Sequence, residues 1–416
     1  MPILFLLFLV GLAVLPLVTH RALALQGKGN GTLPTSVAGE DAHAAIVSCL
    51  SRPSRVCALS SALRAVAAQD LAFDRVETLI ALARAFHALG DDTRAASTAS
   101  LAVRAARAIG ISIGTERKLA EIAPIEAAIG RMQKARALLS EISDPALRAA
   151  TMARIARARA RAGDFEGALK LLDEVNEPWL ALGALADIAE WAAAEDDQSS
   201  VRLVQMLKSR VDRAPRHLLK WLAMARLGAL EAKAGEVEKA RALRDELAEH
   251  VAPGLGYAGE EVRVWAAIAL LDLALDDRAA YDRHVARMLA RVRSVTIDQD
   301  PTTALAEAMT ALAAGGRSDE ALALAGRFRD LRGISELAES LLGHPFARPL
   351  WGALAMRIVD RLKDETSSAE QDRARLVAIR LMIASGRVRE AIALARGLHD
   401  DDAGARALAM LAPHLS

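Results

Sequence analysis

A motif of one glycine, one alanine and one leucine recurs along the chain and constrains its fold more than any other feature. It reads Gly-x4-Ala-x2-Leu, and its copies begin at Gly130, Gly163, Gly235, Gly316 and Gly386. A sixth copy begins at Gly90 and has Thr98 in place of the leucine. Two further turns that have lost their glycine fit at Asp196-Asp197 and Asp276-Asp277. With these turns included, successive copies are 33 to about 41 residues apart. The last interval is 70 residues, which fits two units. Such a period is typical of proteins built from stacked repeats.

The three positions of the motif are those at which two helices of a hairpin meet. Glycine ends a helix because it enters the left-handed backbone conformation at low cost. The alanine five residues later lets the second helix pack closely on the first, and the leucine three residues further on lies on the same face. The motif therefore predicts a tight turn between two antiparallel helices in each unit. An alanine outside it, such as Ala160, is expected to be exposed.

Proline marks the boundaries between units, because it suits the first helical position and an acidic residue before it can cap the helix. Such boundaries lie at Asp144-Pro145, Glu177-Pro178, Ala214-Pro215 and Asp300-Pro301. A further break lies near Gly343-His344-Pro345. With about twenty helical segments and no credible strand, residues 41–416 are expected to form an all-α solenoid of nine to ten antiparallel helix pairs.

The composition agrees with a helical protein. Alanine dominates the apolar residues, and it favours helices over strands. Aromatic residues make up only 3% of the chain, and 53 basic residues balance 52 acidic ones. Nucleic-acid binding relies on a basic surface and on aromatic faces for base stacking, so no nucleic-acid partner is expected.

Several turns resemble those of a known repeat family. The segment Ala162-Gly163-Asp164-Phe165-Glu166-Gly167-Ala168-Leu169 closely resembles the inter-helix turn of a tetratricopeptide repeat, and the segments 234–241 and 385–392 are similar. Small residues also stand seven positions before the glycine, as that family expects, at Ala83, Ala123, Ala156 and Gly228. The family's large aromatics are mostly absent and the period drifts, so the chain resembles a strongly diverged member. The resemblance implies a superhelix whose first helices line a concave groove for proteins or peptides.

The N-terminus has the features of an export signal. Residues 1–18 are almost wholly apolar, and Ala22-Leu23-Ala24 gives the small-x-small pattern of a cleavage site. No Lys or Arg precedes the apolar run, which is also just long enough to span a bilayer as an uncleaved anchor. Residues 1–24 are therefore interpreted as a signal peptide, or else an anchor, and residues 25–40 as a flexible, glycine-rich linker. Either reading places the rest of the chain across a membrane from the cytosol, most simply in a bacterial periplasm.

The only two cysteines, Cys49 and Cys57, flank a predicted break between helices. A cysteine at one helix end and another in the first turn of the next can reach disulfide distance, and an oxidising compartment would preserve the bond. We therefore expect a disulfide, the alternative being two buried thiols. The spacing fits neither a redox C-x-x-C motif nor a zinc site.

Motifs for catalysis or for a cofactor are missing from the sequence. It has no phosphate-binding glycine loop, no His-Glu-x-x-His and no Gly-x-Ser-x-Gly, and its nine histidines are scattered singly. Paired aspartates such as Asp91-Asp92 fall in predicted turns, where they cap helices. We expect no catalytic residue, no cofactor and no metal. One enzyme alternative remains: Glu339-Ser340 resembles the acid Glu and Ser of periplasmic lytic transglycosylases, some of which carry a helical superhelix.

Arginine supplies the candidate binding site. Arg154, Arg157 and Arg161 fall at i, i+3 and i+7 on one face of a predicted first helix, and Arg283, Arg287 and Arg291 form a second stripe. Either stripe could be a solvated face. Arginine also binds carboxylates through paired hydrogen bonds, and a first helix lines the groove in the family that the chain resembles, so the Arg154 stripe is the candidate partner site. The five tryptophans are interpreted as core residues.

The expected function is that of an exported, non-enzymatic scaffold that binds a protein or peptide partner in the bacterial cell envelope, through an acidic segment or a C-terminal carboxylate. Two alternatives stand beside it. The chain could be a structural subunit of an envelope complex, with contacts made by its edges. Less simply, it could be a helical-superhelix enzyme of the cell wall. Contact with a membrane is expected only through an uncleaved N-terminal segment.

Overall fold

The computed structural model describes residues 38–69, 71–195, 199–252, 254–296 and 301–416, which form α-helices and a few 3₁₀ turns without a strand. The predicted all-α fold is confirmed. The predicted signal segment, and the linker up to residue 37, lie outside these residues. The helices are α1 (Ala38–Ser51), α2 (Arg55–Ala68), α3 (Ala72–Ala88), α4 (Asp92–Arg107), α5 (Ser112–Ala128), α6 (Met132–Ser140), α7 (Pro145–Arg161), α8 (Phe165–Asp173), α9 (Pro178–Ala194), α10 (Ser199–Arg213), α11 (Leu218–Lys233), α12 (Val237–Val251), α13 (Ala258–Ala274), α14 (Arg278–Val292), α15 (Pro301–Ala314), α16 (Ser318–Ala325), α17 (Leu331–Leu342), α18 (Arg348–Arg361), α19 (Ser368–Ala384), α20 (Val388–Ala395) and α21 (Asp401–Leu411).

The predicted turns are present. All six motif glycines have positive φ, from 74° at Gly90 to 84° at Gly163. Asp276 has a φ of 54°, so the turn that lost its glycine keeps the left-handed geometry. The other such turn, Asp196-Asp197, lies outside the described residues. The alanines five residues after the glycines are all 0% exposed: Ala95, Ala135, Ala168, Ala240, Ala321 and Ala391.

Two details differ from the sequence expectations. Pro145, Pro178 and Pro301 begin helices as predicted, but Pro215 does not: α11 starts three residues later, where the His217 ring accepts a hydrogen bond from the Leu219 N–H (3.2 Å) and caps the helix. Ala160 was expected to be exposed and is only 3% exposed. The reason is that α7 packs against α5, α8 and α9 at once.

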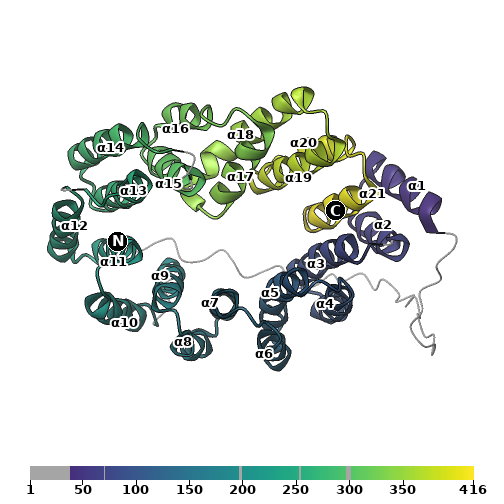
Figure 1. Cartoon of the computed structure of the whole chain (residues 1–416), viewed down its shortest axis with the longest axis horizontal. Helices are drawn as coiled ribbons and strands as arrows, with labels where there is room; N and C mark the ends of the chain where they lie inside the picture. The colour runs from purple at the N-terminus through teal and green to yellow at the C-terminus, as the bar shows by residue number, and fades with distance from the viewer. Residues whose placement is uncertain (1–37, 70, 196–198, 253, 297–300) are drawn as a thin grey trace, which may run out of the picture. The chain divides into compact units, whose positions relative to one another are not determined.

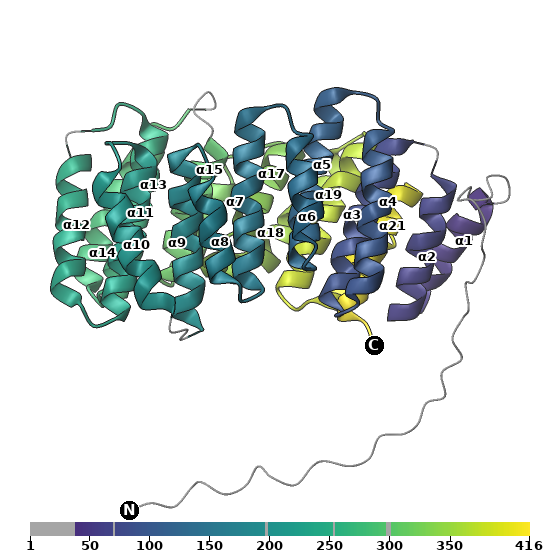
Figure 2. The same cartoon turned by 90° about the horizontal axis from the view of Figure 1, so that it is seen from below.

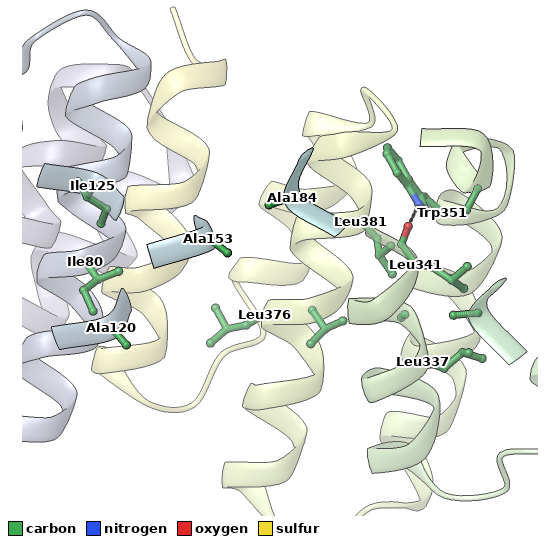
Figure 3. Close-up of a cluster of buried hydrophobic side chains, with 14 of the residues drawn as sticks. Ile80, Ala120, Ile125, Ala153, Ala184, Leu337, Leu341, Trp351, Leu376 and Leu381 are labelled. Atoms are coloured by element: carbon green, nitrogen blue, oxygen red, sulfur yellow. Dashed lines mark hydrogen bonds between the residues drawn. The ribbon is translucent and has the colours of Figure 1, made fainter. Parts of the chain in front are cut away.

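The helices of residues 35–416 lie in two layers (Figures 1 and 2). The odd-numbered helices from α3 to α21 each pack against the next odd-numbered helix and form the inner layer. The even-numbered helices from α4 to α20 pack behind them. The apolar core fills the space between neighbouring helices, with Ile80, Ile125, Leu341 and Leu376 among its members (Figure 3).

The two ends of this unit meet and close it. The α1–α2 hairpin packs on the face of α21 that the next helix of the array would cover. Helix α21 also packs on α3. The Arg55 N–H donates to the Ser416 carbonyl (3.1 Å), and His43 Nδ1 lies 2.7 Å from Asp401 Oδ1. The inner layer is therefore a closed array of helices.

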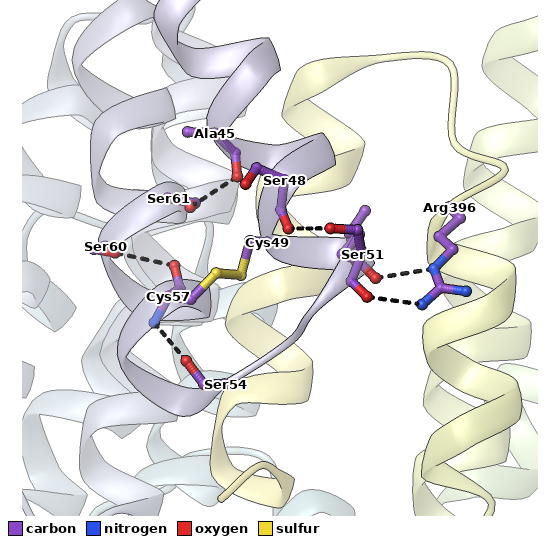
Figure 4. The surroundings of a disulfide bond; sticks show 10 residues. Ala45, Ser48, Cys49, Ser51, Ser54, Cys57, Ser60, Ser61 and Arg396 are labelled. Atoms are coloured by element: carbon purple, nitrogen blue, oxygen red, sulfur yellow. Dashed lines mark hydrogen bonds between the residues drawn. A yellow bond between two sulfur atoms is a disulfide. The ribbon is translucent and has the colours of Figure 1, made fainter.

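A disulfide joins Cys49 of α1 to Cys57 of α2, with the Cα atoms 5.6 Å apart, so that prediction is confirmed (Figure 4). The Ser54 side chain caps α2 by accepting a hydrogen bond from the Cys57 N–H (3.3 Å). Arg396, just beyond α20, donates to the carbonyl oxygens of Leu50 (2.9 Å) and Ser51 (3.5 Å). The disulfide thus joins the two helices of the α1–α2 hairpin, and hydrogen bonds from Arg396 hold the end of α1 to the end of α20.

Candidate functional site

The Arg154 stripe lies where the sequence placed it, on a helix of the inner layer. The Asp144 carboxylate caps α7 by accepting hydrogen bonds from Ala146 N (2.9 Å) and Leu147 N (3.3 Å), and Pro145 begins the helix. Three arginines at helical spacing then line a cavity of about 410 Å³ between α3, α5 and α7. The structure adds Arg84 and His87 from α3 to this wall.

The three arginines of the stripe are engaged differently. Arg157 forms an ion pair with Asp187 of α9. The Arg161 guanidinium lies 4.3 Å from the centre of the Trp191 ring, on which it stacks. Arg154 is exposed and makes no hydrogen bond or ion pair with any described residue. The donors of Arg154 are therefore available to a ligand, whereas those of Arg157 are partly used.

Arg84 is a further unpaired cation, and it lines a second cavity as well. Although its side chain reaches solvent, desolvation by the surrounding protein lowers the pKa of its guanidinium. Glu121 and Glu77 oppose this effect, and the positive charges of Arg380 and Arg154 add to it. Sequence patterns did not indicate Arg84, because it belongs to no arginine stripe and the helices α17, α19 and α21 around it are distant in the chain.

The second cavity, about 790 Å³, lies where the array closes, between α3, α17, α19 and α21. Seven arginines and three glutamates line the two cavities together. The arginines are Arg84, Arg154, Arg157, Arg161, Arg373, Arg380 and Arg406. Because the chain as a whole is nearly neutral, positive charge is concentrated on this part of the inner wall.

Elsewhere in the inner layer, arginines form ion pairs with carboxylates of the neighbouring inner helix. Arg226 of α11 donates to Asp187 (2.6 Å) and Glu190 (2.5 Å) of α9. Burial alone would lower the pKa of Arg226, but the hydrogen bonds and the attraction of these carboxylates raise it. Arg263 of α13 pairs likewise with Glu307 of α15 (3.0 Å). These pairs link neighbouring inner helices, whereas Arg154 and Arg84 are left without such partners.

The second arginine stripe has a structural role. It lies on the outer helix α14, where Arg291 pairs with Glu261 and Arg287 lies 5.1 Å from the Trp265 ring centre. The tryptophans follow the core interpretation only in part. Trp221, Trp265 and Trp351 are buried, but Trp179 and Trp191 are half-buried.

Several acidic residues pair with cationic side chains or cap helices. Glu339 accepts a hydrogen bond from Arg380 (2.9 Å). Asp91 and Asp277 cap helices, as the sequence predicted for aspartates in these turns. Asp272 and His284 form a buried pair (2.6 Å) that the sequence did not reveal. Among the described residues, no group of His, Cys, Asp and Glu side chains is arranged to hold a metal ion.

In the described part of the chain, no helix is both long enough and apolar enough to cross a membrane.

Comparisons with known proteins leave the family open. No family model matches the chain, and no curated protein matches it. A crystal structure of Ton1535 from Thermococcus onnurineus is 13% identical, covers 70% of this chain and 98% of its own, and superposes with a TM-score of 0.29. A circular tandem repeat protein with novel repeat topology and enhanced subunit contact surfaces is 14% identical over 86% of this chain and 91% of its own, with a TM-score of 0.21. The description of the fold therefore rests on this structure itself.

Proposed function

We propose that this protein is an exported, non-enzymatic scaffold that binds a protein or peptide partner in the bacterial cell envelope. The observation that carries the proposal is the unpaired Arg154 in the wall of the 410 Å³ cavity, beside Arg157 and Arg161. An arginine without a partner in a partly enclosed site binds a carboxylate through two parallel hydrogen bonds. A C-terminal carboxylate, or an acidic side chain near a peptide terminus, is the ligand group that this cavity would take.

The cavity size supports a peptide terminus over a folded surface. About 410 Å³ lies within the range of small-molecule sites, roughly 300–1,000 Å³, and accommodates one or two residues. Its floor is apolar, with Ile125, Ala120 and Pro124 from α5. An apolar floor beneath a cationic wall suits a terminal residue that carries both a side chain and a carboxylate.

Two features support export. The disulfide between Cys49 and Cys57 suits an oxidising compartment. The apolar run at residues 1–18, followed by Ala22-Leu23-Ala24, is the expected export signal, although it lies outside the described residues. N-terminal sequencing of the native protein tests this part of the proposal: a chain that starts at Leu25 supports secretion, and an intact Met1 supports the anchor.

The binding proposal is tested by reversing one charge. Arg154→Glu places a carboxylate in the cavity and should abolish crosslinking to the envelope partner. Arg104→Glu on the outer helix α4 is the matched control, since Arg104 is also exposed, and it should leave the crosslink intact. Equal crosslinking by both variants would contradict a role for the cavity.

The assembly alternative has an observation of its own. Near the closing hairpin, Val56 (78% exposed), Leu71 (67%) and Phe73 (49%) present apolar side chains to solvent. An edge contact there would bury them within a larger complex. A complex that survives Arg154→Glu and is lost on Val56→Glu would favour this alternative over the cavity.

The enzyme alternative requires Glu339 to act as an acid on peptidoglycan. The hydrogen bond from Arg380 engages its carboxylate. Peptidoglycan turnover by the purified protein that disappears on Glu339→Gln would establish this activity and overturn the proposal of a non-enzymatic scaffold.

A further inference from the structure

The second cavity depends on closure of the array. One wall is α3, near the start of the described chain, and the other walls are α17, α19 and α21, near its end. These walls meet because α21 packs on both α2 and α3. The site, of about 790 Å³, therefore exists only while α21 stays packed on α3.

The lining of this cavity has an apolar part and a cationic part, together with Glu77 and Glu339, which pair with Lys118 and Arg380. Ile80 of α3, Leu376 and Ile383 of α19, and Met410 of α21 give it an apolar surface (Figure 3 shows Ile80 and Leu376). Arginines border this surface on several sides: Arg84, Arg373, Arg380 and Arg406. An aliphatic group would lie on the first part and an anion against the second.

Two of these arginines line the same cavity from different helices and have donors to spare. Arg84 makes no hydrogen bond or ion pair with any described residue. Arg380 uses its Nη1 to donate to Glu339 (2.9 Å), which leaves its other nitrogens available. The two guanidinium groups are close enough for their charges to repel each other. An anion between them would remove that repulsion and gain hydrogen bonds from both.

We propose that this cavity binds a small amphipathic carboxylate, with the carboxylate between Arg84 and Arg380 and an aliphatic segment along Ile80, Leu376 and Met410. Such a group is present both in a free aliphatic acid and in the apolar C-terminal residue of a peptide. The site is separate from the Arg154 site, although Arg84 borders both, and it does not depend on the function proposed above.

Occupancy of this site should be linked to closure. A ligand that touches α3 together with α19 and α21 binds the closed array and not an opened one, so it stabilises closure. Amide hydrogen exchange should therefore slow in α21 as well as in α3 when the ligand is bound.

The experiment is calorimetric titration of the full-length protein with decanoate, with decanol, and with an acetylated peptide ending in Leu-Leu as the free acid or the amide. We expect the acids to bind, and decanol and the amide to bind at least tenfold more weakly. Binding of decanoate alone identifies a free acid as the source of the carboxylate, and binding of the peptide acid alone identifies a peptide terminus. If neither acid binds, or if decanol binds as well as decanoate, the proposal is overturned.

Substitutions of single residues locate the site. Arg380→Gln should weaken binding of the acid at least tenfold. Ala88→Phe should do the same by filling the cavity from its exposed position on α3, and Ala137→Phe on the outer helix α6 is its matched control. Arg104→Gln, on the outer helix α4 and outside both cavities, should have no effect. If Arg154→Gln abolishes binding and Arg380→Gln does not, the carboxylate lies in the first cavity; that result overturns this proposal and supports the function proposed above. Slowed exchange confined to α3, α5 and α7 would overturn it equally.

Discussion

At the scale of single residues, the fifth position after each turn decides how closely two helices pack. It is a buried alanine in six units, and in the unit that begins at Asp276 it is Tyr281, which is also 0% exposed. The Tyr281 hydroxyl donates to the Ala311 carbonyl (3.1 Å), and a Cβ on Gly315 would overlap the Tyr281 hydroxyl and ring. A large residue on one helix is thus accommodated by a glycine at the end of the next.

We expect Ala168→Leu to lower the free energy of unfolding by about 1–3 kcal/mol, because the position has no room for added methylene groups. Ala137→Leu is the control, since Ala137 is exposed and leucine is nearly as good a helix former. Urea denaturation of both variants measures the difference. An equal response would mean that the motif alanine is not a packing position.

Gly315→Ala should also destabilise the protein by about 1–3 kcal/mol, because its methyl group would overlap the buried Tyr281 ring. Combining it with Tyr281→Ala recreates the alanine of the other units. The two changes should therefore cost less together than the sum of their separate costs in a double-mutant cycle. Strict additivity would show that Tyr281 and Gly315 are not coupled.

At the scale of helices, side-chain hydrogen bonds fix where one unit ends and the next begins. The Glu116 carboxylate of α5 accepts hydrogen bonds from the Ser143 hydroxyl (2.5 Å) and from the N–H groups of Ser143 (3.2 Å) and Asp144 (3.3 Å). These residues lead into α7, which carries the Arg154 stripe. The hydrogen bonds from Ser143 and Asp144 lower the pKa of Glu116 from its usual 4.5.

Because the pKa of Glu116 is lower in the folded than in the unfolded chain, its contribution to stability is present above about pH 4.5 and is lost as the pH falls through the folded value. Glu116→Gln should therefore be less stable than wild type at pH 7, and this difference should shrink below pH 4.5. Urea denaturation at pH 7 and pH 3.5 measures it. A difference that stays constant with pH would show that the charge of Glu116 is not involved.

At the scale of the whole unit, closure changes how the repeats depend on each other. In an open array each helix pair contacts only its neighbours, and stability is approximately a sum of local terms. Here the hairpin of α1 and α2 covers α21, so that the last helix also has a partner. The loss of that hairpin exposes one face of α21 and one face of α3 at the same time.

Deletion of residues 1–69 should open the array. We expect a larger radius of gyration by small-angle X-ray scattering and a broader, less cooperative denaturation curve, since the α2–α21 and α3–α21 contacts would no longer reinforce each other. Cys49→Ser combined with Cys57→Ser is the milder variant: it should lower stability by about 2–3 kcal/mol and leave the radius unchanged. An unchanged radius in the deletion variant would contradict the role of the hairpin in closure.

The sequence by itself determined the helical class, the six glycine turns, the buried alanines, the disulfide and the position of the Arg154 stripe. These follow from contacts that are local in the chain, such as a left-handed glycine, a cap or residues one helical turn apart. Only the tertiary structure decided that Ala160 is buried, that Tyr281 replaces an alanine opposite Gly315, and that Arg84 and Arg380 share a cavity. The shared cavity depends on helices far apart in the chain that meet when α21 closes on α2 and α3. The burial of Ala160 and Tyr281 depends on how neighbouring helices pack, and no pattern local to the chain records these contacts.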